Sequence, residues 1–321
     1  MTKPALMIGL GEVLWDLLPS GKVLGGAPAN FAYMTNVLGD RGVVASRLGN
    51  DELGREACRV MQDLGLDTSY VQQDAQHETG IATVEIDSAG QPNFTIKKFV
   101  SWDYLQWTPA WQELSAQADV ICFGSLAQRS TDSAVTIEAF LRNAPDTALR
   151  IFDANLRQSF YNKYTVQKSC EHAHIVKLNE QEVLQISYLL RIGVGSEEIL
   201  AKRLLNDYGL RLVCITRGAR GSLLVSKEQT VEHKGFRVKV ADAIGAGDAF
   251  TACLAHHYLR GRSLEEISEA ANRFASWVAT QTGATPPIST GQIRNIFGDL
   301  GSSKDFFKAE VIADELGRRE E

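Results

Sequence analysis

The chain has 321 residues, 44% of them hydrophobic and 22% charged, so it is long enough to bury one large core and has the composition of a globular protein. Its formal net charge of −6 argues against nucleic acid or an anionic membrane as the main partner. There is no charge-free apolar run of membrane-spanning length and no signal-peptide pattern, and the five cysteines form neither a CxxC nor a disulfide ladder. We therefore expect a cytoplasmic protein with reduced thiols.

Short apolar runs alternate with amphipathic stretches along most of the chain. The runs predict strands at 5–10, 42–48, 119–123, 150–153, 174–178 and 212–216. The amphipathic stretches predict helices at 28–38, 52–64, 132–142, 180–187, 197–208, 246–260 and 264–280. This alternation is typical of an α/β fold with a mainly parallel sheet and helices on both faces.

Two segments, 12–22 and 79–99, are rich in β-formers without intervening helices, and Ser88-Ala89-Gly90 has the composition of a hairpin turn. Such a small group of strands cannot build its own core, so we expect a β lid over the main domain, within about 12–25 and 79–105. A lid of this kind excludes water from a reaction. The main domain is predicted to span 1–301, and the polar segment 302–321 to form a peripheral tail.

Asp16 lies in an apolar context and is followed by Gly25-Gly26 and Asn30. A carboxylate in such surroundings needs hydrogen-bond donors, and a sugar diol supplies two. Glycines let backbone amides approach the same hydroxyls. These residues therefore favour a sugar site. The alternative interpretation makes Asp16 an exposed residue of an edge strand and Asn30 a polar residue on a helix face.

Three polar clusters follow predicted strands directly, and ligands of open parallel sheets bind beyond the carboxyl ends of the strands. The residues concerned are Asn155, Arg157, Asn179, Glu182, Thr216, Gly218 and Gly221. Arg157 can supply a cation to a transferring phosphoryl group. Asn179 and Glu182 either form a capping box at a helix start or hold metal-bound waters near nucleotide phosphates. The turn that contains Gly218 and Gly221 either joins two strands or binds the phosphates of a nucleotide.

The segment DAIGAGDAF places Asp248 in the first turn of a predicted helix, behind Gly245 and Gly247. The unpaired N–H groups and dipole of a helix N-terminus attract anions, above all phosphate. An anion hole beside a carboxylate base suits phosphoryl transfer to a hydroxyl. The alternative is a tight loop in which Asp248 only complements the helix dipole.

Taken in order, LGGAPANFAYMTNVLGDRGVVASRLGNDELG, FDANLR, KLNEQE, TRGARG and DAIGAGDAF resemble the ribokinase-like sugar kinases, the PfkB carbohydrate kinases, over nearly the whole chain. GEVLWDLLP, GGAPANFAY and FGSLAQRS are most similar to fructokinases. The resemblance implies a three-layer sandwich with a small β-sheet lid, and possible homodimerisation through that lid. It also implies ATP-dependent phosphorylation of a sugar, with Mg²⁺ and commonly K⁺.

The resemblance further assigns site residues. It implies Asp248 as the base and amides of Gly245, Ala246 and Gly247 as the anion hole. The sugar and the transferred phosphoryl would be contacted by Asp16, Gly25, Gly26, Asn30, Asn155, Arg157 and Asp248. The nucleotide would be contacted by Asn179, Glu182, Thr216, Gly218, Gly221, Gly245, Gly247 and Asn272. The monovalent cation would be held by Asp242 and by carbonyls of Ile244, Val278, Gln281 and Gly283.

D-Fructose, phosphorylated on a primary hydroxyl, is the expected acceptor. The alternatives are 2-keto-3-deoxygluconate, ribose or a nucleoside. A keto acid calls for extra cations near the lid, where Lys97 and Lys98 form the adjacent pair. A non-catalytic sugar sensor is the alternative of another class.

Overall fold

A computed structural model of the chain describes residues 3–18, 21–86 and 92–298. Its main sheet has the strand order β13-β12-β11-β10-β9-β8-β1-β4-β5. The strands are β1 (Leu6–Leu10), β4 (Arg41–Gly49), β5 (Val71–Asp74), β8 (Val120–Phe123), β9 (Leu149–Asp153), β10 (Ile175–Asn179), β11 (Leu212–Thr216), β12 (Ser222–Val225) and β13 (Thr230–His233). From β5 to β11 all neighbours are parallel, and β12 and β13 add antiparallel pairs at one edge. The predicted mainly parallel sheet is confirmed.

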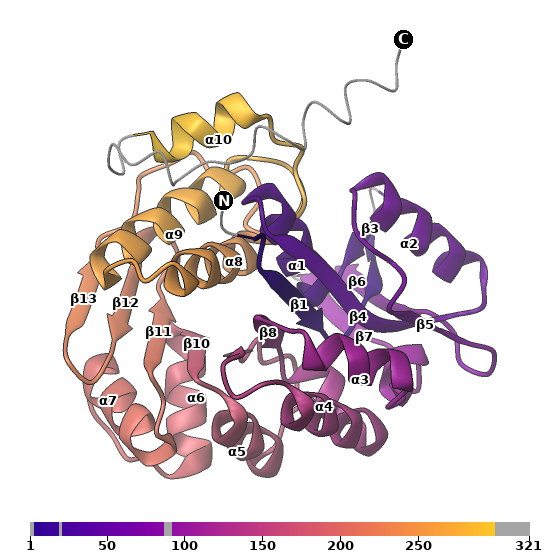
Figure 1. The fold of residues 1–321 in the computed structure, drawn as a ribbon, viewed down its shortest axis with the longest axis horizontal. Helices are drawn as coiled ribbons and strands as arrows, with labels where there is room; N and C mark the ends of the chain where they lie inside the picture. Colours follow the sequence, from indigo (N-terminus) through magenta and orange to yellow (C-terminus); the bar gives the residue numbers. More distant parts are fainter. Residues whose placement is uncertain (1–2, 19–20, 87–91, 299–321) are drawn as a thin grey trace.

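Helices cover both faces of this sheet, which makes the three layers visible in Figure 1. They are α1 (Ala27–Val37), α2 (Glu52–Asp63), α3 (Pro109–Ala116), α4 (Thr131–Asn143), α5 (Lys163–His172), α6 (Glu180–Leu190), α7 (Glu197–Tyr208), α8 (Ala246–Leu259), α9 (Leu264–Ala279) and α10 (Thr290–Phe297). One core cluster joins the sheet to α3–α7 and the other joins it to α1, α2 and α8–α10. Met7 and Ile8 of β1 belong to different clusters, because successive strand residues point to opposite faces.

All the predicted strands and helices of the main domain are present within one to three residues of their expected bounds. Sequence analysis missed β5, β12, β13, α3, α5 and α10. The missed strands have four residues each, too few to establish a period. Cap residues did mark all three missed helices, since Thr108, Asn162 and Ser289 accept hydrogen bonds from the first turns of α3, α5 and α10.

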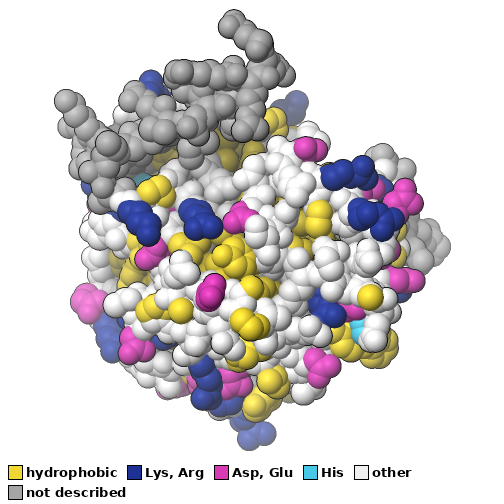
Figure 2. Space-filling model, turned by 45° about the vertical axis from the view of Figure 1, so that its right-hand side comes forward, with side chains coloured by type: hydrophobic (Ala, Val, Ile, Leu, Met, Phe, Trp, Pro, Cys, Tyr) yellow, Lys and Arg dark blue, Asp and Glu magenta, His cyan; other side chains and the backbone are white. Residues whose placement is uncertain are grey.

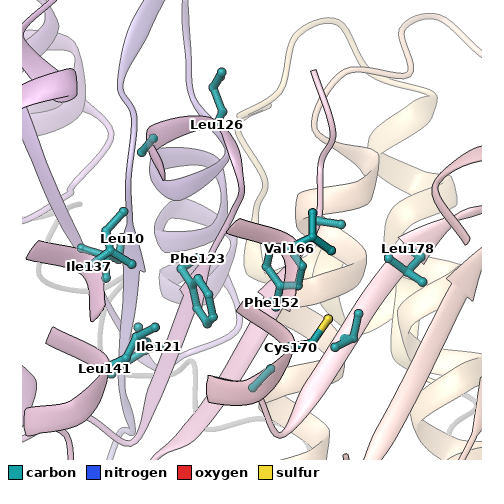
Figure 3. Close-up of a cluster of buried hydrophobic side chains, with 14 of the residues drawn as sticks. Leu10, Ile121, Phe123, Leu126, Ile137, Leu141, Phe152, Val166, Cys170 and Leu178 are labelled. Atoms are coloured by element: carbon teal, nitrogen blue, oxygen red, sulfur yellow. The ribbon is translucent and has the colours of Figure 1, made fainter. Parts of the chain in front are cut away.

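The core beneath the strand ends is packed with aromatic and aliphatic side chains (Figure 3). Phe123 of β8 and Phe152 of β9 are stacked with ring centroids 5.5 Å apart, and both are almost fully buried. Val166 and Cys170 of α5 pack in the same cluster. Burying each large apolar side chain contributes about 1.5–3 kcal/mol, so these strands form a rigid support for the loops at their carboxyl ends.

A separate four-stranded sheet of order β3-β2-β6-β7 forms the lid. Its strands are β2 (Leu14–Leu18), β3 (Gly21–Gly25), β6 (Gly80–Ile86) and β7 (Pro92–Ile96). The prediction of a lid distinct from the main sheet is confirmed. The predicted hairpin turn 88–90 and the predicted tail 302–321 lie outside the described residues. Homodimerisation through the lid stays a prediction.

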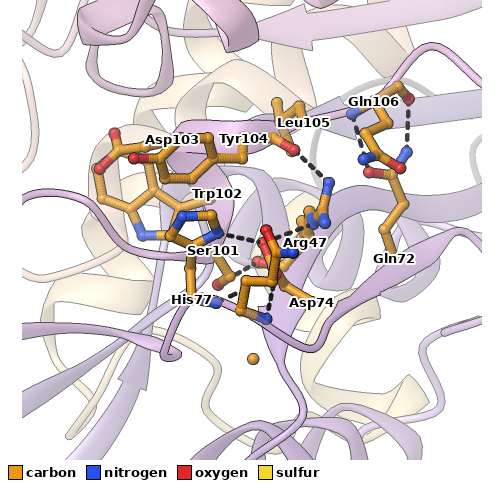
Figure 4. A network of polar contacts seen from close by, with 12 residues as sticks. Arg47, Gln72, Asp74, His77, Ser101, Trp102, Asp103, Tyr104, Leu105 and Gln106 are labelled. Atoms are coloured by element: carbon orange, nitrogen blue, oxygen red, sulfur yellow. Dashed lines mark hydrogen bonds and ion pairs between the residues drawn. The ribbon is translucent and has the colours of Figure 1, made fainter.

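The segment that returns from the lid to the core is fastened to strand β4 (Figure 4). Arg47 of β4 forms an ion pair with Asp74 at 3.0 Å and donates a hydrogen bond to the carbonyl of Tyr104 at 2.5 Å. Ser101 donates in turn to the carbonyl of Arg47 at 2.9 Å. The base of the lid is therefore anchored to the main sheet by buried polar contacts.

On the face shown in Figure 2, basic and acidic side chains are interspersed, and no single sign of charge covers it. Within the described ranges, none of the helices combines the length and the apolar character that crossing a membrane requires. The five cysteines are free thiols, as expected.

Candidate active site

The N-terminus of α8 lies at the carboxyl edge of the main sheet. Gly245 is its N-cap, with a φ of 79° that favours glycine, and a Cβ there would come within 2.7 Å of the backbone of Ala284. A Cβ on Gly247 would lie 3.0 Å from Nζ of Lys177. The Ala246 N–H makes a long contact of 3.4 Å to the carbonyl of Ala243. The first turn is thus a cradle with little spare space, whose free N–H groups suit an anion.

Asp248 stands in this first turn, and its Oδ2 accepts a hydrogen bond of 2.8 Å from Nδ2 of Asn30 on α1. Burial and the negative charge of Asp153 raise the pKa of Asp248 to about 6, against the lowering effects of Asn30, Lys177 and Arg157. At neutral pH the carboxylate is therefore mostly ionised and still a stronger base than an ordinary aspartate. The structure brings together Asn30 and Asp248, which are 218 residues apart in the chain.

This pKa predicts the acid limb of the pH profile. Below a pH of about 6 the Asp248 carboxyl holds a proton and cannot accept another, so kcat/KM for the acceptor should fall about tenfold per pH unit. The charged groups facing it are Asp153, Lys177, Arg157 and Glu12. The measurement is kcat/KM between pH about 4.5 and 8. A profile that stays flat down to the lower limit would exclude Asp248 as the base.

A buried ion pair beside the cradle was missed by sequence analysis. Nζ of Lys177 on β10 lies 3.0 and 3.1 Å from the two carboxylate oxygens of Asp153 at the end of β9. Asp153 also accepts a hydrogen bond of 2.8 Å from Oγ1 of Thr251 on α8. Burial alone would lower the pKa of Lys177, but the charges of Asp153, Glu182 and Asp248 outweigh it and the pKa is raised. A charged ammonium therefore lies against the first turn of α8. A lysine flanked by apolar residues in IVKLN was the available signal.

The predicted sugar-binding residues of the lid lie together. Asp16 is on β2, between β3 and β6, so it is not on an edge strand. A Cβ on Gly25 would lie 2.3 Å from the Asp16 carboxylate, and one on Gly26 would lie 2.5 Å from the carbonyl of Glu12. Burial raises the pKa of Asp16, and the positive charge of Arg157 lowers it.

Asn155 and Arg157 occupy the loop after β9, as predicted. Asn155 is in the left-handed region with a φ of 42°, and Arg157 is exposed. The positive charge of Arg157 lowers the pKa values of Asp16 and Asp248. Its guanidinium is therefore close enough to act electrostatically on a residue of the lid and on the first turn of α8.

Asn179 and Glu182 form a capping box at the start of α6. The Asn179 side chain accepts hydrogen bonds from the N–H groups of Gln181 and Glu182, both at 2.9 Å. The two carboxylate oxygens of Glu182 accept from the N–H groups of Asn179 at 2.8 Å and Leu156 at 2.9 Å. These contacts favour the structural interpretation of Glu182, whose ligand role stays a prediction.

Thr216 ends β11 directly opposite Asn179 of β10, so both lie at the same edge. In the turn that follows, Gly218 and Gly221 have φ values of 55° and 83°. A Cβ on Gly218 would meet nothing within 4 Å, whereas one on Gly221 would overlap the carbonyl of His233. The turn therefore presents open backbone at Gly218, as a nucleotide site requires.

The amide nitrogen of Asn272 has partners within the protein, and the predicted nucleotide role of this residue stays a prediction. Its Nδ2 donates to Oγ of Ser222 and to the carbonyl of Ser268, both at 2.7 Å, and the residue is buried between α9 and β12. Internal packing thus occupies the donor that the resemblance assigned to the nucleotide.

The segments of the predicted cation site converge. Asp242 accepts hydrogen bonds from the N–H groups of Ile244 at 3.0 Å and Gly283 at 3.3 Å. The carbonyl of Val278 accepts from the N–H of Gln281 at 2.9 Å. Oxygen donors of this kind fit a hard cation. Among the described residues, no group of three His, Cys, Asp or Glu is placed to hold a metal ion.

Comparisons with known proteins agree with this geometry. The profile of the pfkB family carbohydrate kinases matches residues 20–291. A fructokinase of Escherichia coli is 30% identical over 306 residues, which cover 88% of this chain and 96% of that protein. The structure of an ATP-bound fructokinase of Xylella fastidiosa superposes with a TM-score of 0.79 at 22% identity, covering 93% of this chain and 99% of that one. A Vibrio cholerae fructokinase with bound fructose, ADP and potassium has a TM-score of 0.75 at 24% identity, covering 88% and 94%.

Proposed function

Because the chain belongs to the pfkB family of carbohydrate kinases, we propose that it is a fructokinase that transfers the γ-phosphoryl group of ATP to a primary hydroxyl of D-fructose. The observation that carries this proposal is the Asp248 carboxylate, held by Asn30 in the first turn of the glycine-lined helix α8. This arrangement places a base in the first turn of a helix whose N-terminus suits an anion. A non-catalytic sugar sensor has no need of that combination.

In the proposed reaction, the oxygen of the acceptor hydroxyl forms a bond to the γ-phosphorus of ATP, and Asp248 accepts the proton of that hydroxyl. The bond between the γ-phosphorus and the oxygen that bridges to the β-phosphate breaks, and ADP leaves. The hydrogen bond from Asn30 orients the carboxylate. Phosphoryl transfer has a loose transition state, so positioning and charge stabilisation contribute more than the strength of the base. The fixed amides at Gly245–Gly247, the ammonium of Lys177 and the guanidinium of Arg157 provide that stabilisation.

Two ions fit the site. Mg²⁺ bound with ATP neutralises phosphate charge, and Asn179, Glu182 and Thr216 lie at the sheet edge where the nucleotide is proposed to bind. K⁺ is proposed to bind at Asp242 and at carbonyls of the neighbouring segment. The potassium-bound fructokinase of Vibrio cholerae supports this assignment by analogy.

The acceptor site suits a neutral polyol better than a sugar acid. It offers the Asp16 carboxylate and backbone amides at Gly25 and Gly26 to hydroxyl groups. Near the lid, Lys97 forms an ion pair with Glu78. Lys98 lies 5.3 Å from the centre of the Phe160 ring. Paired cations are poorly suited to bind a carboxylate, so fructose is favoured over 2-keto-3-deoxygluconate.

The test is a coupled assay of ADP release with fructose, glucose, ribose, adenosine and 2-keto-3-deoxygluconate. We expect the highest kcat/KM with fructose, because a site built to bind hydroxyls rejects analogues that leave its polar groups unpaired, by up to about 10⁴–10⁵-fold. A higher value for any other acceptor contradicts the fructokinase assignment but keeps the kinase. No ADP release with any acceptor favours the sugar sensor.

A further inference from the structure

The main sheet has its topological switch point between β1 and β8. From β1 the sheet continues through β4 to one edge, and from β8 it continues through β9 to the other. Ligands of open α/β sheets bind in the crevice beyond the carboxyl ends of the two strands at such a point. Glu12 follows β1 by two residues, and Arg129 ends the short helix η2 (Leu126–Arg129) that follows β8. Neither residue has a role in the function proposed above.

Glu12 is a buried acid with an unused oxygen. Only 4% of the residue is exposed, and among the described residues its Oε2 is one of the few buried side-chain atoms without a hydrogen-bond partner. Burial raises the pKa of Glu12 to about 7. A buried polar atom left unpaired costs about 1–3 kcal/mol, so a protein has a reason to keep one only if something else pairs with it.

Two observations associate Glu12 with the proposed acceptor site. The charges acting on Glu12 are those of Arg157, Asp248 and Arg129. Its carbonyl lies against Gly26, where a Cβ would approach it to 2.5 Å. The Glu12 side chain is therefore close enough to the proposed base, Asp248, for their charges to interact, and the Glu12 backbone packs against the proposed sugar-binding turn at Gly26.

Arg129, which follows β8, is a second polar residue with a buried side-chain atom at the switch point. Its guanidinium donates to Asp103 at 2.7 and 2.8 Å and lies 3.9 Å from the centre of the Trp102 ring, yet its buried Nη1 has no partner within the described residues. A hydroxyl group can both donate a hydrogen bond to a carboxyl oxygen and accept one from a guanidinium. The unpaired atoms thus match a neutral polyol.

We propose that Glu12 is a specificity-determining residue whose Oε2 hydrogen-bonds a hydroxyl of the acceptor sugar other than the hydroxyl that is phosphorylated. The proposal rests on the sugar-kinase function proposed above and names a sugar contact additional to Asp16 and Asn30. It explains why a costly buried carboxyl is kept at the switch point.

The test combines Glu12→Leu and Glu12→Gln with monodeoxy analogues of fructose, or of whichever sugar is the best wild-type acceptor. We expect Glu12→Leu to lower kcat/KM for the sugar about 10- to 100-fold, because the variant leaves a sugar hydroxyl without its buried hydrogen-bond partner, with KM for ATP unchanged. The wild type should discriminate against every deoxy analogue. Glu12→Leu should lose its discrimination against one of them, and Glu12→Gln, which keeps an acceptor oxygen, should retain part of it.

A stability measurement separates this role from a structural one. Replacing an unpaired buried acid by an apolar side chain should leave the thermal midpoint unchanged or raise it, whereas loss of a structural contact would lower it. Glu113→Gln, an exposed change on α3, is the control for both readouts. The proposal for Glu12 is overturned if Glu12→Leu discriminates against all analogues as the wild type does, or if it lowers the thermal midpoint without changing the sugar kinetics. Neither result contradicts the proposed sugar-kinase function. A wild-type chain that phosphorylates no sugar overturns both.

Discussion

Replacing Asp248 by Asn should lower kcat by about 10²–10⁴-fold and leave KM for the sugar within a few-fold. The side chains are nearly equal in size, and the amide oxygen of the new residue can still accept the hydrogen bond from Asn30. Binding geometry is therefore retained, while the group that accepts the hydroxyl proton is lost. Steady-state kinetics with the best acceptor provide the measurement.

Asp63→Asn provides the matched control, because it makes the same chemical change at an exposed position at the end of α2. It should have wild-type kinetics. A variant at Asp248 that keeps more than about a tenth of the wild-type kcat would show that another group accepts the proton. The acid limb of the pH profile should also disappear from the residual activity of Asp248→Asn.

Lys177→Met should reduce both stability and turnover. Removing the ammonium leaves the buried Asp153 carboxylate unpaired, which destabilises a fold by about 3–5 kcal/mol. It also removes a positive charge beside Gly247, and losing one preorganised group that stabilises a transition state costs about 10²–10³-fold in kcat. Thermal unfolding and steady-state kinetics measure the two effects.

The double variant Lys177→Met, Asp153→Asn separates these effects. With both charges removed, most of the lost stability should return, because no unpaired charge remains in the core. Turnover should remain low if Lys177 stabilises the transferring phosphoryl group. Recovery of kcat together with stability would mean that the ion pair only supports the fold.

Much of the architecture could be predicted from local sequence. The period of apolar residues in 52–64 and 264–280 was sufficient to place α2 and α9, since amphipathic helices carry their own signal. The lid was predicted because 12–22 and 79–99 lack helices between their β-forming runs, and β2 and β6 indeed pair outside the main sheet. The spacing of small and apolar residues in 246–260 predicted α8, whose N-cap is Gly245 with a positive φ.

The roles of individual site residues were harder to predict from local sequence. Asn179 with Glu182 matched both a capping box and a ligand pair, and the structure shows the capping box, with Glu182 also bound to the N–H of Leu156. The resemblance assigned Asn272 to the nucleotide, and local sequence did not reveal that its amide nitrogen donates to Ser222 and Ser268; the nucleotide contact stays a prediction. A side chain's partner depends on which strand packs against its helix, and no local pattern records that.

Local sequence was sufficient to predict most of the longer strands and helices of the main domain, the separate lid, and the motif that couples a carboxylate to a helix N-terminus, since each depends on residues close together in the chain. The tertiary structure alone decided which distant groups meet there. Lys177 reaches Gly247 only because β10 lies beneath α8, and the Asp248 pKa rises to about 6 only because burial and Asp153 surround it. Burial and electrostatic pairing act through space, so the chemistry of this site emerges only when the sheet brings its strand ends to one edge.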